Sequence, residues 1–144
     1  MTEYRKILVA VDLTEQSDRV VARGLALARL TGAEVSLLHV VEYVPVEPMG
    51  EALLPAVDIE EELVAGARKR LEDLAGRHGV PERERRVECG NIKSEIVRIA
   101  EESQADLIVL GSRERHGLAV MLNLAEDAIL HAAPCDVLAV RVAD

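Results

Sequence analysis

Short apolar runs of strand length recur along this chain, and stretches of helical periodicity separate them. Residues 7–11, 35–41 and 107–110 are mostly apolar, which is typical of strands covered on both faces of a parallel sheet. Residues 84–88 predict a short polar strand at a sheet edge, and residues 136–142 predict a last, apolar strand. Five strands that alternate with helices, joined by right-handed crossovers, predict one α/β domain with helices on both faces of a doubly wound parallel sheet.

Turn and capping signals predict where the first two helices lie. Apolar positions at helical spacing predict a helix over residues 14–30, with Gly32 just past its end. Residues 42–57 contain three prolines and no clear periodicity, so we expect a long loop there. Asp58 with Glu61 resembles a capping box, which predicts that the second helix begins at Asp58.

The stretch over residues 105–130 combines a strand, a loop and a helix. Its apolar run is predicted to end at Gly111, where a polar loop begins, and helical periodicity resumes at about Asn123. Asn123 with Glu126 resembles a capping box, which predicts a helix over residues 123–132 with Glu126 and Asp127 in its first turn. Anions often bind at such a junction because the first helical N–H groups are unpaired.

Composition excludes several classes of protein. The 144 residues suit one domain, residues 1–144, with an aliphatic core, because 49% are hydrophobic and only Tyr4 and Tyr43 are aromatic. A net charge of −9 and few aromatics argue against nucleic acid as a partner. No apolar run approaches membrane-spanning length, so we expect a cytoplasmic protein. Cys89 and Cys135 have no metal-type or CxxC spacing and are expected to be reduced.

Four segments, in this order and spacing, together resemble the universal stress protein family, and its UspA-like branch in particular. They are Ile7-Leu-Val-Ala-Val-Asp-Leu-Thr-Glu-Gln-Ser17, Val35-Ser-Leu-Leu-His-Val40, Ala105-Asp-Leu-Ile-Val-Leu-Gly-Ser112 and Ala133-Pro-Cys-Asp-Val-Leu-Ala-Val140. The resemblance implies a Rossmann-like fold with the strand order 3-2-1-4-5. It also implies a binding cleft bounded by Asp12, Val40, Gly111 and Gly117.

The phosphate-binding loop of the family is degenerate in this sequence. Nucleotide-binding members carry Gly, two residues, Gly, nine residues, Gly, and then Ser or Thr. The matching positions here hold Gly111, Glu114, Leu124 and Ala125. Glycine lets backbone N–H groups approach phosphate, and the hydroxyl donates a hydrogen bond, so three of the four positions lose that chemistry. We expect no tight ATP binding in the usual pose of the family.

Charges near the loop leave two interpretations open. Glu126 and Asp127 add carboxylates where a polyphosphate would lie, although acids also stabilise the first turn of any helix. Arg113, Arg115 and His116 either offset those acids in part or form a solvated loop. A smaller anion or an adenosine-type ligand stays open, and no cofactor is expected.

Asp12 and His39 each have a structural and a functional interpretation. Asp12 closes the first strand, where it either bonds N–H groups of the following turn or lies beside a ligand, as the resemblance implies. His39 is flanked by apolar residues, which favours a buried, hydrogen-bonded histidine over a catalyst. If a nucleotide binds, the candidate residues are Ala10, Val11, Asp12, Val40, Gly111, Ser112, Glu114, Gly117, Leu124 and Ala125.

These features favour a non-enzymatic stress-response protein that acts as a homodimer without ATP. The alternative is a stress switch that binds an adenine nucleotide, ATP or another, through the divergent loop and hydrolyses it slowly. A phosphoaccepting receiver would share the fold type, but Asp12 alone is too little support for it. No sequence motif of a hydrolase or of an acid/base enzyme is present.

The last strand is the expected dimer interface. It is apolar and no later element covers it, so its open backbone groups are expected to pair with the same strand of a second copy about a two-fold axis, as the resemblance also implies. Leu138 and Val140 are predicted to meet their counterparts, whereas a monomer would need Arg141 and Asp144 to protect the edge. The residues of this predicted interface are Asp136, Val137, Leu138, Ala139, Val140, Arg141 and Val142.

Overall fold

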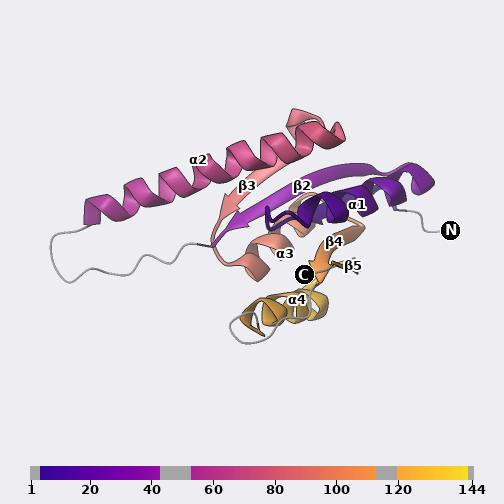
Figure 1. Ribbon diagram of the computed structural model, residues 1–144. Helices are drawn as coiled ribbons and strands as arrows, with labels where there is room; N and C mark the ends of the chain where they lie inside the picture. The colour runs from indigo at the N-terminus through magenta and orange to yellow at the C-terminus, as the bar shows by residue number, and fades with distance from the viewer. Residues whose placement is uncertain (1–3, 43–52, 113–119, 143–144) are drawn as a thin grey trace.

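The chain folds into one five-stranded parallel sheet with helices on both faces (Figure 1). The computed structural model describes residues 4–42, 53–112 and 120–142, and within them only the backbone of residues 53–58 and 120–125. The strands are β1 (Lys6–Ala10), β2 (Glu34–Val41), β3 (Arg85–Cys89), β4 (Leu107–Ser112) and β5 (Asp136–Arg141). The helices are α1 (Ser17–Thr31), α2 (Leu53–His78), α3 (Ile92–Glu102) and α4 (Val120–Ala132), with a short 3₁₀ turn at Glu82–Glu84. The sheet order is β3-β2-β1-β4-β5, which confirms the predicted fold class and strand order.

The central strand β1 has a separate apolar cluster on each face. Val9 pairs in register with Leu37 of β2 and Val109 of β4, and all three are fully buried on the face covered by α1 and α2. On the other face Leu8 packs with Ile96 and other residues of α3 and α4. Figure 1 shows α2 and α4 on opposite sides of the sheet. Residues of alternating orientation in one strand therefore supply both halves of the core.

Close packing of α1 on β1 depends on a glycine. A Cβ atom added to Gly24 would lie 2.6 Å from Cγ2 of Val9, so only glycine fits between the helix and the strand. At the end of α1, Gly32 has a φ of 76° and its N–H bonds to the Ala28 carbonyl, which confirms the predicted helix stop.

The predicted start of the second helix was wrong. α2 begins at Leu53, inside the segment predicted as a loop, and Asp58 lies within the helix instead of at its cap. Pro55 is the third residue of α2, and proline is tolerated there because a first-turn N–H has no partner in its own helix.

The predicted junction between the fourth strand and the last helix was also wrong. β4 continues through Gly111 and Ser112, which pair in register with Val140 and Arg141, so the loop does not begin at Gly111. α4 begins at Val120, three residues before the predicted cap Asn123. Its first turn contains no acidic residue, because Glu126 and Asp127 come one turn later.

The other element boundaries agree with the predictions to within a few residues. β3 lies at one edge of the sheet, as the polar third strand predicted, and β5 lies at the other. Across the three described ranges, no helix is long and apolar enough to span a lipid bilayer.

Candidate functional site

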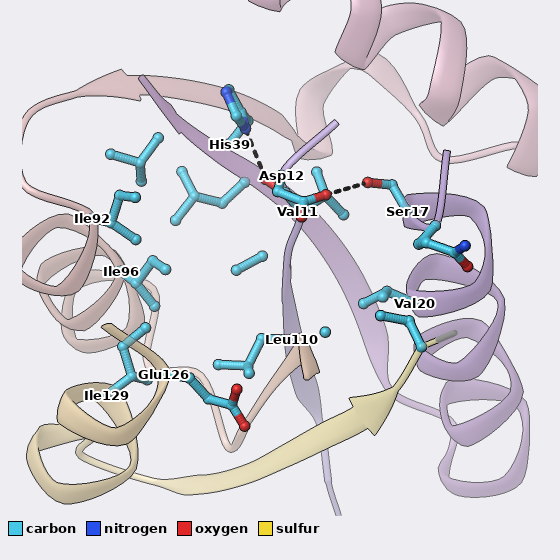
Figure 2. A pocket seen from close by; sticks show the side chains of 16 residues that line it. Val11, Asp12, Ser17, Val20, His39, Ile92, Ile96, Leu110, Glu126 and Ile129 are labelled. Atoms are coloured by element: carbon cyan, nitrogen blue, oxygen red, sulfur yellow. Dashed lines mark hydrogen bonds between the residues drawn. The ribbon is translucent and has the colours of Figure 1, made fainter. Parts of the chain in front are cut away.

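A cavity of about 170 Å³ opens at the carboxyl ends of β1 and β4 (Figure 2). The strand order reverses between these two strands, and parallel α/β sheets commonly bind ligands at this position. The described residues around it are Ala10, Val11, Asp12, Gln16, Ser17, Val20, Leu38, His39, Val40, Ile92, Ile96, Leu110, Gly111, Glu126, Ile129 and Val142. Most of these side chains are aliphatic, so the cavity is an apolar hollow with a few polar groups around it.

Asp12 organises the turn that follows β1. Its Oδ1 atom accepts hydrogen bonds from the Thr14 backbone N–H at 3.0 Å, the Thr14 hydroxyl at 2.7 Å and the Ser17 hydroxyl at 3.1 Å. Ser17 is the first residue of α1 and is 2% exposed. These bonds match the structural interpretation of Asp12, in which a short acidic side chain fixes a turn and the start of a helix.

The same turn holds an unusual backbone conformation. Leu13 has a φ of 61°, which is uncommon for a residue other than glycine, and its side chain is buried. Nη2 of Arg70, from α2, donates a hydrogen bond to the Leu13 carbonyl oxygen at 2.6 Å. α2 therefore helps to fix the turn that carries Asp12.

His39 is held by the backbone of β1 and stays uncharged. Its Nδ1 atom lies 2.7 Å from the Val11 carbonyl oxygen, so Nδ1 carries the hydrogen of the neutral ring. Burial lowers the pKa of His39 below its ordinary value, against the opposing effect of this hydrogen bond. At neutral pH the ring therefore brings no positive charge to the cavity, in keeping with the structural role expected for it.

A small residue in β1 creates the hollow. Ala10 pairs in register with Leu38, and both residues line the cavity together with Leu110 of β4. Ile96 of α3 and Ile129 of α4 form the opposite wall, and both are buried. The short side chain of Ala10 leaves unfilled the space that a larger apolar residue would take.

Glu126 gives the hollow a negative charge. Its half-buried side chain lies beside Leu110 and Ile129, across the cavity from Asp12 in the view of Figure 2. Among the described residues, no side chain makes a hydrogen bond or ion pair with the Glu126 carboxylate, and none of the described cavity residues is lysine or arginine. An anion in this hollow would meet carboxylates and no described cation.

The structure brings together half of the residues predicted for a nucleotide. Five of them, Ala10, Val11, Asp12, Val40 and Gly111, line the cavity, whereas Ser112 does not and pairs with Arg141 in the sheet. Glu114 and Gly117 lie outside the described residues, and only the backbone of Leu124 and Ala125, within α4, is described.

Gly111 packs against a helix. A Cβ atom at Gly111 would lie 3.2 Å from Cγ2 of Val20, so the glycine allows β4 to approach α1 closely. Packing of β4 against α1 is therefore a sufficient reason for a glycine at position 111, and no phosphate-binding role is needed to explain it.

The sequence did not identify the hydrocarbon wall as part of a site. Leu38, Ile92, Leu110 and Ile129 follow the ordinary periodicity of core residues, which does not separate a filled core from a hollow one. The one available signal was Ala10, a small residue within a strand of larger aliphatic ones.

Both cysteines are free and half-buried. Burial raises the pKa of the Cys89 and Cys135 thiols, which keeps them protonated and weakly nucleophilic. Within the described ranges, no group of three or more histidine, cysteine or acidic side chains is arranged to hold a metal ion.

The sheet order and the position of the cavity define a Rossmann-like α/β protein. The family model described as "Universal stress protein family" matches residues 3–141. The chain therefore belongs to the universal stress protein family.

Individual relatives agree with this assignment over their whole length. Universal stress protein A homolog 1 of Coxiella burnetii is 38% identical over 138 residues, which cover 95% of this chain and 96% of the relative. Homolog 2 of the same organism is 36% identical over 143 residues, covering 99% and 98%.

Solved structures share the fold. The universal stress protein UspA from Lactobacillus plantarum superposes with a TM-score of 0.76 at 24% identity, covering 98% of this chain and 100% of its own. A universal stress protein in complex with cAMP superposes with a TM-score of 0.61 at 22% identity, covering 96% and 98%.

Proposed function

We propose that this chain is a non-enzymatic stress-response protein of the cytoplasm that acts as a homodimer and without ATP. The observation that carries the proposal is the character of the cavity at the ends of β1 and β4. Its described residues are mostly aliphatic and include the carboxylates of Asp12 and Glu126 but no lysine or arginine.

Electrostatics disfavour a polyphosphate at this place. A phosphate about 5 Å from a carboxylate costs roughly 1–3 kcal/mol at an effective dielectric between that of a protein surface and that of water. The degenerate loop weakens phosphate binding further, because Glu114, Leu124 and Ala125 replace the glycines and the hydroxyl that bind phosphate in relatives.

The geometry around Asp12 supports a non-enzymatic role. Ser17 donates its hydroxyl hydrogen bond to Asp12, and the Nδ1 atom of His39 is occupied by the Val11 carbonyl oxygen. Among the described residues of the cavity, no histidine is therefore hydrogen-bonded to a hydroxyl that it could activate.

Titration calorimetry with Mg-ATP tests ATP independence. We expect no site with micromolar affinity in the wild-type protein. Restoring the family pattern with Glu114→Gly, Leu124→Gly and Ala125→Ser should increase the affinity if the loop alone limits binding. A stoichiometric micromolar site in the wild-type protein would overturn the proposal.

A second candidate is a stress switch that binds an adenine nucleotide through the divergent loop and hydrolyses it slowly. The universal stress protein in complex with cAMP shares the fold, which is the observation that favours this candidate, and cAMP carries a single phosphate. Parallel titrations with cAMP and Mg-ATP separate the candidates, because the switch requires saturable binding of at least one of them.

The dimer is proposed to form through β5, which has no described neighbour beyond it in the sheet. Val140 is only 3% exposed within one chain, so it has little surface left for a partner. The side-chain contact expected at Leu138 and Val140 therefore shifts to Val137, Leu138 and Ala139, which are half-buried in the single chain.

The backbone of β5 supplies the hydrogen bonds for such a pairing. The Val142 N–H donates to the Ser112 carbonyl oxygen of β4 at 3.0 Å. Successive N–H groups alternate between the two sides of a strand, so the N–H groups of Val137, Ala139 and Arg141 point away from β4. Those donors are directed toward the open edge.

Light scattering at micromolar concentration tests the dimer. We expect twice the chain mass of 15.7 kDa for the wild-type protein and a shift toward one chain mass for Ala139→Pro, which removes an outward N–H. Ala139→Ser keeps the N–H and serves as the matched control. A wild-type mass near 15.7 kDa would refute the dimer, and a dimeric proline variant would place the interface elsewhere.

A further inference from the structure

We propose that the cavity beside Ala10 binds a small apolar amine, with its hydrocarbon part in the hollow and its ammonium group on the Glu126 carboxylate. This ligand class differs from the nucleotides considered above. The proposal does not depend on the dimer.

The hollow has the shape and the lining that hydrocarbon prefers. Ala10, Leu38 and Leu110 from three adjacent strands form its floor, and Ile96 and Ile129 from two helices form its wall. Hydrocarbon placed there leaves water for an apolar surface, and this transfer stabilises binding in proportion to the area buried.

The volume limits the size of the ligand. A dry cavity of about 150 Å³ in another protein, lined by aliphatic and aromatic side chains, accommodates a benzene molecule. The cavity here measures about 170 Å³, so one six-membered ring or a hydrocarbon of similar volume fits.

The charge of the ligand follows from Glu126. The Glu126 side chain is half-buried and lies beside the hydrocarbon wall, and no described residue gives its carboxylate a hydrogen bond or an ion pair. A hydrocarbon ligand would displace water from this carboxylate, and an ammonium group restores both the opposite charge and the hydrogen-bond donors. An ammonium group joined to a single ring meets both requirements of the cavity.

Methyl NMR with benzylamine, benzyl alcohol and benzoate tests the proposal. The protein has no Phe and no Trp, so an added aromatic ring shifts methyl resonances against little background. We expect benzylamine to shift the methyl resonances of Ala10, Leu110 and Ile129 and to bind about five- to tenfold more tightly than benzyl alcohol, with benzoate weaker still.

Two variants separate the charge from the hollow. Glu126→Gln should lower the affinity for benzylamine to that for benzyl alcohol, whereas Asp127→Asn, one residue away and exposed, should leave both affinities unchanged. Ala10→Leu should fill the hollow and weaken both ligands. If Ala10→Leu does not fold, Glu126→Gln with its control decides the matter.

Three results would overturn the proposal. The first is that benzoate shifts the same methyl resonances as strongly as benzylamine, and the second is that Glu126→Gln leaves the preference for benzylamine intact. The third is that millimolar benzylamine shifts none of these resonances. A saturable ATP site found by calorimetry would contradict the proposed function but would leave these comparisons readable.

Discussion

Val9 and Ala10 are neighbours in β1, yet they face opposite sides of the sheet. The packing density around their side chains differs strongly. Val9 is fully buried and so close to α1 that Gly24 has no room for a Cβ atom. Ala10 faces α3 and α4, where a cavity of about 170 Å³ remains. Packing is tight around Val9, whereas Ala10 borders a hollow that also reaches Val20 of α1, at the end of the sheet where ligands bind in this class of fold.

Polar contacts reinforce the difference between the two sides. On the dense side, Arg77 and His78 of α2 both contact the Asp18 carboxylate of α1. On the hollow side, Arg98 of α3 pairs with Glu88 of β3, and no described ion pair joins α3 to α4. Among the described residues, ion pairs therefore join the two helices of the dense side, whereas α3 and α4 meet through the apolar cluster that borders the cavity.

The largest effect is expected from Val9→Ala, which should lower the free energy of unfolding by roughly 2–4 kcal/mol. The removed methyl groups are fully buried between β2, β4 and α1, and the surrounding helix cannot collapse fully into the space. Denaturant unfolding measures the change. A loss below that of Asp12→Ala would contradict the dense packing assigned to this side.

Gly24→Ala should be the next largest change and should cost up to about 2 kcal/mol. Alanine favours a helix by about 1 kcal/mol over glycine, but a methyl group 2.6 Å from Cγ2 of Val9 forces overpacking that costs about 1–3 kcal/mol. In the Val9→Ala background the clash disappears, so the two changes together should cost less than their sum.

A matched control for Gly24→Ala lies on the other side of the strand. Ala10→Val adds hydrocarbon toward the hollow and should be neutral or stabilise by up to about 1 kcal/mol. If Ala10→Val destabilised the protein as much as Gly24→Ala does, the two sides of β1 would not differ in packing.

Asp12→Ala is expected to cost about 1 kcal/mol or less. The Asp12 carboxylate accepts hydrogen bonds from Thr14 and Ser17 in a turn. Its side chain is exposed, so in the variant water can take over part of the hydrogen bonding of these donors. Thermal melts compare this variant with Val9→Ala. A larger loss for Asp12→Ala would place Asp12 in a tightly coupled network and would reopen a functional role for it.

Asp18→Asn should have the smallest effect, below about 1 kcal/mol at neutral pH, because the Asp18–Arg77 pair is about half exposed. The hydrogen bond from Arg77, with help from His78, lowers the pKa of Asp18 in the folded state. Its contribution is therefore complete above the unfolded-state pKa of about 4 and is lost as the pH falls through the lower folded-state value.

Unfolding free energies measured between pH 7 and acid test this effect of Asp18. The difference between the wild-type protein and Asp18→Asn should shrink as the pH falls below about 4. Glu72→Gln, an exposed change on α2, the helix that carries Arg77, is the control and should show no such trend. A difference that grew in acid would mean that folding raises the pKa of Asp18 instead of lowering it.

Much of this structure could be predicted from the sequence, because buried parallel strands consist of continuous runs of apolar residues. The runs around Val9, Leu38 and Val109 gave the strands, and the family resemblance gave their order. The starts of α2 and α4 could not be predicted, because the capping pairs Asp58–Glu61 and Asn123–Glu126 lie inside helices that begin earlier. A capping motif uses residues that are also common on helix surfaces, so the pattern alone does not locate a helix start.

The candidate site was only partly predictable. The family resemblance implied that Asp12, Val40 and Gly111 border a cleft, and the structure places all three around the cavity. The hollow itself depends on how far α3 and α4 lie from Ala10, and that distance is set by tertiary packing, which a linear pattern of apolar residues does not contain.

The ultraviolet spectrum of protein purified without added nucleotide tests the central claim most directly. The chain contains two tyrosines and no tryptophan, so its own absorbance near the maximum of a nucleobase is low. If the chain works without a bound nucleotide, the spectrum should contain tyrosine absorbance alone, and acid treatment should release no nucleobase. Release of about one adenine per chain would contradict that claim and would favour the nucleotide switch.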